Sequence, residues 1–138
     1  MPAVADTSYV LAVAIETDKN HEPSLAVYHE QEVIYLPQTT LAEIAYFLTR
    51  YFDNKVMAHF LVQLPETKYR VLALEPQDFL RTAEILNQYA DSRVDFVDAT
   101  VAAVAERLKI TRILTLDQRD FRIIRPKHID YFDLLPAN

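Results

Sequence analysis

Short apolar runs with the composition of buried strands alternate along this chain with segments of helical periodicity. The strand-like runs lie at residues 3–5, 33–36, 69–74 and 113–116, with a further edge strand expected within 128–135. Parallel strands need long crossover connections, and right-handed crossovers place helices over both faces of a sheet. The alternation therefore predicts an α/β fold, a three-layer α/β/α sandwich with a central, mostly parallel sheet.

The segments between these runs carry the spacing of amphipathic helices. Leu41, Ile44 and Leu48, for example, recur at the interval that places side chains on one helix face. Helices are expected at residues 8–15, 23–30, 41–52, 56–64, 79–89 and 95–108. After Asp117, we expect only a turn through Gln118 and Arg119.

The length and composition favour one globular unit. A chain of 138 residues, with 51% hydrophobic and 25% charged residues, is sufficient for one full core and too short for two ordinary domains. We therefore expect a single domain spanning residues 1–138. No apolar stretch is long enough to cross a bilayer, and the first six residues lack the regions of a signal peptide. A cytoplasmic protein without a membrane partner is expected.

The chain contains neither cysteine nor glycine. The lack of cysteine excludes disulfides, thiolate zinc sites and a cysteine nucleophile. The lack of glycine excludes the dinucleotide fingerprint and the P-loop, whose backbone must approach phosphate closely. The histidines, His21, His29, His59 and His128, are scattered without the four-residue spacing of a metal-binding pair. A metal site here would therefore depend on oxygen ligands.

Four carboxylates stand where a strand-like run gives way to a turn or to the start of a helix. They are Asp6, Glu43, Asp98 and Asp117. In a parallel sheet such positions share one edge, the carboxyl ends of the strands, where α/β folds place their active sites. Crowded carboxylates raise one another's pKa, and a divalent cation removes the repulsion. Oxygen ligands favour Mg²⁺ or Mn²⁺ over zinc.

Each of these acids also has a local structural explanation. Asp6 is placed to cap the helix that follows it. Glu43 lies three residues after Thr40, which is the spacing of a capping box. Asp95 is placed to cap the next helix, with Asp98 in its first turn, where the helix dipole favours an acid. The coincidence of the acids at one sheet edge is what favours a metal site.

Basic residues gather in the last third of the chain. Between residues 107 and 127, seven Lys and Arg residues stand against two acidic ones, although the whole chain has a net charge of −6. Such a stretch would hold a phosphate backbone beside a metal. Arg119, Arg122 and Arg125 are the candidates, because they follow Asp117 closely. The alternative is a set of solvated surface charges.

Two other chemistries are less favoured by the sequence. Tyr46, Phe47, Tyr51 and Phe52 could stack on nucleobases, but their helical spacing favours packing within the protein. Ser8 could suggest a serine hydrolase, but the glycine-flanked nucleophile elbow is missing.

Four short segments occur in an order and spacing that span nearly the whole chain. They are Val4-Ala5-Asp6-Thr7-Ser8-Tyr9, Leu41-Ala42-Glu43-Ile44, Asp95-Phe96-Val97-Asp98-Ala99 and Ile113-Leu114-Thr115-Leu116-Asp117, the last followed by Asp120-Phe121. In this combination the chain resembles the PIN domain, and within it the small bacterial and archaeal proteins similar to VapC toxins of toxin–antitoxin pairs.

The resemblance implies an endoribonuclease that depends on Mg²⁺ or Mn²⁺. The family's acidic catalytic and metal-binding positions correspond to Asp6, Glu43, Asp98 and Asp117. Supporting polar positions correspond to Ser8 and Thr115, with Asp95 as a further acid of the site or only a helix cap. The resemblance also implies an RNA substrate, a homodimer and a cognate antitoxin that inserts a segment near the acidic site.

Three alternatives stay open at this point. The chain could be a PIN-like interaction module without nuclease activity, or a nuclease acting on other nucleic acids. Phosphoryl transfer on an aspartate is a third class. It is disfavoured because the first acid is followed by Thr7 and Ser8, where such phosphatases need a second aspartate, and because receiver domains need an adjacent acidic pair.

Overall fold

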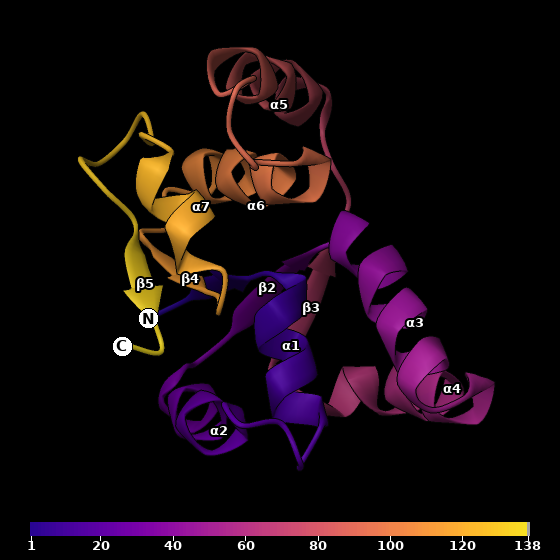
Figure 1. Ribbon diagram of the computed structural model, residues 1–138. Coiled ribbons are helices and arrows are strands. Elements are labelled where there is room, and N and C mark those ends of the chain that lie inside the picture. The colour runs from indigo at the N-terminus through magenta and orange to yellow at the C-terminus, as the bar shows by residue number, and fades with distance from the viewer. Residues whose placement is uncertain (138) are drawn as a thin grey trace.

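The computed structural model, which describes residues 1–137, is built around a five-stranded sheet (Figure 1). Its strands are β1 (Ala3–Ala5), β2 (Ile34–Pro37), β3 (Tyr69–Leu72), β4 (Arg112–Leu114) and β5 (Asp133–Leu135). They lie in the order β3-β2-β1-β4-β5, and each neighbouring pair is parallel. The predicted α/β fold is confirmed, and this sheet is parallel throughout.

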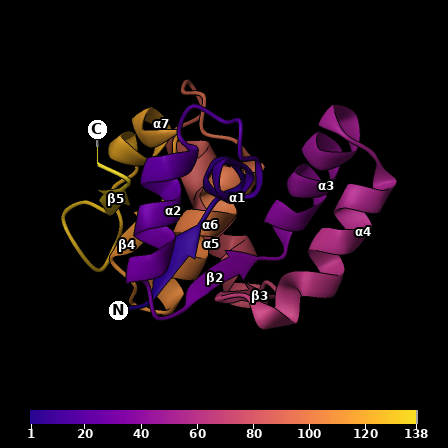
Figure 2. The ribbon, with the colours of Figure 1, turned by 90° about the horizontal axis from the view of Figure 1, so that it is seen from below.

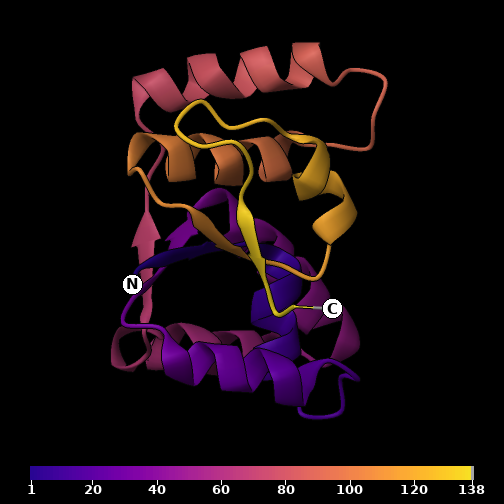
Figure 3. The same cartoon turned by 90° about the vertical axis from the view of Figure 1, so that its left-hand side faces the viewer.

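Helices cover both faces of the sheet (Figure 3). The helices are α1 (Thr7–Ala14), α2 (His21–Glu30), α3 (Thr39–Tyr51), α4 (Asn54–Gln63), α5 (Pro76–Gln88), α6 (Phe96–Arg107) and α7 (Gln118–Ile123), with a short 3-10 turn η1 (Leu64–Glu66) after α4. Helices α5 and α6 stack on one side of the sheet and α2 lies on the other. Within residues 1–137, no helix is long and apolar enough to cross a membrane.

Two cores form because side chains of a strand point alternately to the two faces of a sheet. Val4 and Ile113 are fully buried in the core that also contains residues of α6. Their neighbours Ala5 and Leu114 are fully buried in the core that contains residues of α1. Burial on both faces explains why β1 and β4 appear in the sequence as uninterrupted apolar runs. It also places the residues that follow them, Asp6 among them, at the carboxyl edge of the central strands.

Helices α3 and α4 form a hairpin that stands apart from the rest of the chain (Figure 2). The inner face of α3 buries Ile44 and Leu48 in the core, as its spacing predicted. Helix α4 has no buried residue of its own. The hairpin therefore forms one wall at the carboxyl edge of the sheet, and another face of α3 borders the cavity described below.

The main difference from the sequence-based expectation is α7, which replaces the turn predicted after Asp117. This helix has six residues, too few to establish a periodic pattern. It is held by the burial of the Phe121 ring. Helix α2 also begins at His21, earlier than expected, so that Pro23 lies within its first turn. Pro23 is tolerated there because the first N–H groups of a helix have no partner within the helix.

Candidate active site

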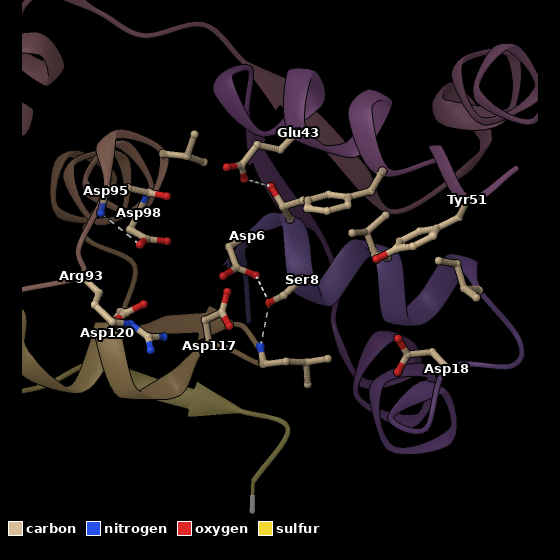
Figure 4. A pocket seen from close by; sticks show the side chains of 16 residues that line it. Asp6, Ser8, Asp18, Glu43, Tyr51, Arg93, Asp95, Asp98, Asp117 and Asp120 are labelled. Atoms are coloured by element: carbon tan, nitrogen blue, oxygen red, sulfur yellow. Dashed lines mark hydrogen bonds and ion pairs between the residues drawn. The ribbon is translucent and has the colours of Figure 1, made fainter. Parts of the chain in front are cut away.

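A cavity of about 510 Å³ opens at the carboxyl edge of the sheet (Figure 4). Its acidic lining residues are Asp6, Asp18, Glu43, Asp95, Asp98, Asp117 and Asp120. The four acids proposed from the sequence as catalytic and metal-binding all belong to this set. Residues that are widely separated in the chain therefore meet in one cavity, as the strand-end positions predicted.

Asp6 follows β1 directly and occupies the N-cap position of α1. Its Oδ1 accepts hydrogen bonds from the Tyr9 N–H (3.2 Å) and the Ser8 hydroxyl (2.7 Å), and its Oδ2 accepts one from the Thr115 hydroxyl (2.6 Å). The residue is only 3% exposed. Burial raises the pKa of Asp6 to about 7, against the lowering effect of these hydrogen bonds, and the nearby Asp117 carboxylate adds to the rise. Asp6 is thus both a helix cap and a member of the acidic cluster.

Ser8 and Thr115 link the ends of the two central strands. The Ser8 hydroxyl accepts a hydrogen bond from the Leu116 N–H (2.9 Å) while donating to Asp6. The Thr115 hydroxyl accepts one from the Asp117 N–H (2.9 Å) while donating to the same carboxylate. Both residues therefore hold Asp6 in place, which agrees with the supporting role that the family resemblance implied.

Glu43 lies on α3, and its contacts contradict the capping-box alternative. The Thr7 hydroxyl donates to Glu43 Oε1 at 2.6 Å. Thr40 is not the cap residue, because α3 already begins at Thr39 and the Thr40 hydroxyl donates to the Pro37 carbonyl (2.8 Å). The Glu43 carboxylate is oriented by a residue of α1 and lines the cavity.

Asp95 and Asp98 form a reciprocal capping box at the start of α6. The Asp98 N–H donates to Asp95 Oδ1 (2.9 Å), and the Asp95 N–H donates to Asp98 Oδ2 (3.3 Å). The capping role predicted for Asp95 is confirmed. Burial, together with the neighbouring Asp95 and Asp6 carboxylates, raises the pKa of Asp98 to about 8. Capping has not removed Asp98 from the cavity. Its place in the first turn of α6 is therefore compatible with the metal-binding role, which stays a prediction.

Arg93 and Asp120 also line the cavity, and the sequence reasoning did not assign them to the site. Burial raises the pKa of Asp117, the Asp120 carboxylate raises it further, and the Arg93 guanidinium opposes the rise. Arg93 Nε lies 3.9 Å from Asp120 Oδ1, and the Arg93 side chain is 70% exposed. Asp120 follows Asp117 by one helical turn, so a prediction of α7 would have found it. Arg93 lies in the loop before α6 and carries no local sequence signal.

The three arginines proposed to contact the substrate do not line the cavity. Arg122 Nη2 donates to Gln118 Oε1 (3.2 Å). The Arg125 guanidinium lies over the Tyr131 ring, 5.2 Å from its centroid. Arg119 is exposed on α7. Contacts of these side chains with RNA stay a prediction for parts of a substrate that extend beyond the cavity.

The chemistry of the cavity fits a hydrated Mg²⁺ or Mn²⁺ ion. Among residues 1–137, no group of three His, Asp or Glu side chains is arranged to hold a metal ion by itself. Mg²⁺ does not require such a cage, because it keeps several water ligands and binds through one or two carboxylates. Burial is the main cause of the raised pKa values of Asp6, Asp98 and Asp117, so ionising these carboxyls without a cation is unfavourable. A divalent cation would offset this cost by stabilising the ionised carboxylates.

The chain belongs to the PIN domain family, whose sequence pattern it matches over residues 3–125. The family resemblance is thereby confirmed. Among curated relatives, the chain is 24% identical to Ribonuclease VapC26 of Mycobacterium tuberculosis (strain ATCC 25618 / H37Rv) over 134 residues, which are 96% of this chain and 99% of the relative.

Solved structures of bacterial proteins share the fold of this chain, and two of them are compared with it below. The crystal structure of Mycobacterium tuberculosis VapC20, described as a Sarcin-Ricin loop cleaving toxin, superposes with a TM-score of 0.73 and 21% identity, covering 80% of this chain and 86% of that one. VapBC2 from Rickettsia felis, bound to a DNA fragment from its promoter, superposes with a TM-score of 0.70 and 13% identity, covering 97% and 98%. At these identities the matches establish the fold.

Proposed function

We propose that this chain is a Mg²⁺- or Mn²⁺-dependent endoribonuclease and the toxin of a toxin–antitoxin pair. The observation that carries the proposal is the meeting of Asp6, Asp98 and Asp117 in one cavity at the carboxyl edge of the sheet, with the pKa of each raised. Membership of the PIN domain family and the similarity to a ribonuclease along almost the whole chain support the RNA substrate.

In the proposed phosphodiester hydrolysis, some side chains of the cavity bind the metal and others position these ligands. One or two of the carboxylates Asp6, Asp98 and Asp117 would ligate the metal directly, and the remaining acids, Glu43 among them, would act through its water molecules. When bound, a divalent ion lowers the pKa of its water and neutralises charge on the phosphate. The hydroxyls of Ser8 and Thr115 fix the Asp6 carboxylate, and the Thr7 hydroxyl fixes Glu43. No protein nucleophile is required.

The proposal includes a cognate antitoxin, a homodimer and action in the cytoplasm. Support for an antitoxin comes from the structural neighbours, which include a toxin–antitoxin complex from Klebsiella pneumoniae with a TM-score of 0.68. The convergence of the family's acids in one cavity argues against an interaction module without activity. A nuclease acting on other nucleic acids is the second candidate, and a DNA substrate in the assay below distinguishes it.

The test of the function is metal-dependent RNA cleavage by the purified protein. We expect cleavage of single-stranded RNA in Mg²⁺, its loss in EDTA and its recovery when Mg²⁺ is restored. Asp130→Asn, which changes an exposed acid outside the cavity, is the matched control and should leave cleavage unchanged. Cleavage that persists in EDTA, or that occurs only with DNA, would contradict the proposal.

Replacing Arg93 with alanine should reduce kcat/KM for RNA by about ten- to a hundredfold. Arg93 is the only basic residue lining the cavity among residues 1–137, and a charged hydrogen bond to phosphate contributes about 1.5–3 kcal/mol. Arg93→Lys keeps the charge and should recover part of the loss. The measurement is steady-state cleavage of one RNA at two salt concentrations, because loss of a phosphate contact weakens the salt dependence.

Arg119→Ala is the comparison for this prediction. Arg119 is exposed and lies outside the cavity, so its removal should cost less than removal of Arg93. If Arg119→Ala proves the more damaging change, the substrate contact lies on α7, where the sequence alone placed it.

A further inference from the structure

The cavity has a second end, where apolar side chains predominate and Asp18 is the acid present. Leu11 and Ile15, in and directly after α1, line it together with Phe47 and Tyr51 of α3. Glu43, Phe47 and Tyr51 follow one another at four-residue intervals, so one face of α3 passes from the acidic cluster to the aromatic rings. Figure 4 shows Tyr51 beyond Glu43, on the side away from Asp98. The acidic and aromatic ends are therefore parts of one continuous cavity.

These aromatic rings are not part of the protein core, contrary to the sequence-based expectation. The Phe47 and Tyr51 rings stack with centroids 6.0 Å apart and an interplanar angle of 18°. Tyr51 is 62% exposed. The core side of α3 is instead filled by Ile44 and Leu48. The Tyr51 ring, supported by the half-buried Phe47 ring, thus presents an open surface inside the cavity that holds the acids.

We propose that this aromatic end binds a nucleobase of the RNA, stacked on Tyr51 and Phe47, beside the phosphate that is cut. The inference rests on the proposed ribonuclease function. Single-stranded RNA is commonly recognised by stacking of its unpaired bases on aromatic side chains. From the rise of about 1.5 Å per residue, Phe47 and Tyr51 lie roughly 6 Å and 12 Å along the helix from Glu43. A base within a few nucleotides of the cut reaches this distance.

The negative charge of the protein makes base stacking an important source of RNA affinity in this cavity. The chain has a net charge of −6, and one basic residue accompanies seven acids among the described lining residues of the cavity. Attraction between cationic side chains and phosphate is therefore limited. Stacking on an aromatic ring does not depend on charge, so it binds RNA in a cavity where the phosphate contacts alone are few.

The test separates binding of a base from cleavage of the backbone. Short labelled single-stranded RNA of mixed sequence, and an abasic ribose-phosphate strand of equal length, are titrated in Mg²⁺ against the Asp98→Asn protein, which should cleave too slowly to affect the titration. Tyr51→Ala, Tyr51→Phe and Phe79→Ala are added in this background. Phe79 is the matched control, because it is an exposed aromatic (55%) on α5, outside the cavity.

We expect the RNA to bind about tenfold or more tightly than the abasic strand, since one stacked base contributes a factor of this size. Tyr51→Ala should remove most of that difference, while Tyr51→Phe and Phe79→Ala should keep it. Equal binding of both strands, or an undiminished difference in Tyr51→Ala, would overturn the inference. The inference would also be overturned if Tyr51→Ala changed the mass of the oligomer without changing the affinity for RNA. The rings would then form a contact between protein chains.

If the proposed ribonuclease function is wrong, the cleavage assay gives a different result from the one that would contradict the nucleobase site. In that case the protein with the native Asp98 does not cleave RNA in Mg²⁺, whatever the binding titration gives. A base-dependent affinity that is lost in Tyr51→Ala would then still support the nucleobase site. Conversely, normal cleavage with no preference for bases over the abasic strand would leave the ribonuclease intact and remove only this inference.

Discussion

Replacing Asp98 with asparagine should lower RNA cleavage by on the order of a hundred- to a thousandfold while the protein stays folded. The substitution removes a negative charge from the metal-binding cluster, and losses of this size follow when one electrostatic contact to a reacting group is deleted. The asparagine Oδ1 can still accept the hydrogen bond that the Asp95 N–H donates at the start of α6. The measurement is kcat/KM for RNA in Mg²⁺, together with the melting temperature.

The melting temperature distinguishes a loss of catalysis from a loss of folding. Burial already raises the pKa of Asp98 to about 8, so a neutral side chain suits this position at least as well as a carboxylate. We expect Asp98→Asn to melt at or above the temperature of the unmodified protein at pH 8. A large fall in melting temperature would attribute the lost activity to unfolding. Full activity in the variant would exclude Asp98 from catalysis.

The metal-free protein should become less stable as the pH rises from about 4 to about 8. The native pKa of Asp6 is about 7 and that of Asp98 about 8, whereas the ordinary value is 3.8. Over this range the unfolded chain has released protons that the native protein keeps, so a rise in pH favours unfolding. The stabilisation is complete below pH 4 and is lost as the pH passes through 7 and 8. For Asp6 it is on the order of 4 kcal/mol.

Urea titrations at pH 5, 6, 7 and 8 measure this dependence directly. Mg²⁺ should restore stability mainly at the upper end of the range, because only ionised carboxylates bind it, and its binding should release protons. Asp98→Asn should show a shallower decline of stability with pH, since residue 98 no longer titrates. A stability that is constant or increases from pH 5 to 8 without metal would show that the acids are compensated within the protein.

The sequence was informative wherever structure is local or fully buried. Strands β1 and β4 are buried on both faces, so their apolar runs were visible, and Asp6 and Asp117 were found because they follow those runs. Asp95 and Asp98 were readable as a cap because the hydrogen bonds involved span three residues.

Other features of the site depend on contacts between residues far apart in the sequence, which no local sequence pattern predicts. Thr40 and Glu43 have the spacing of a capping box, but the actual partner of Glu43 is Thr7, 36 residues away. Arg93 reaches the cavity only because the loop before α6 folds next to α7. The aromatic residues of α3 have helical spacing, and that spacing cannot distinguish a ring that faces the core from one that faces a cavity.

The hydroxyls of Ser8 and Thr115 join the first strand to a segment more than a hundred residues later. Strand β4 lies beside β1 in the sheet although it is almost the last strand to be synthesised. A chain still emerging from the ribosome without residues 112–117 lacks Asp117, which lines the same cavity as Asp6, and one neighbour of β1. Translation order therefore delays assembly of the acidic cluster until the chain is nearly complete, and fragments produced by premature termination lack the complete cluster.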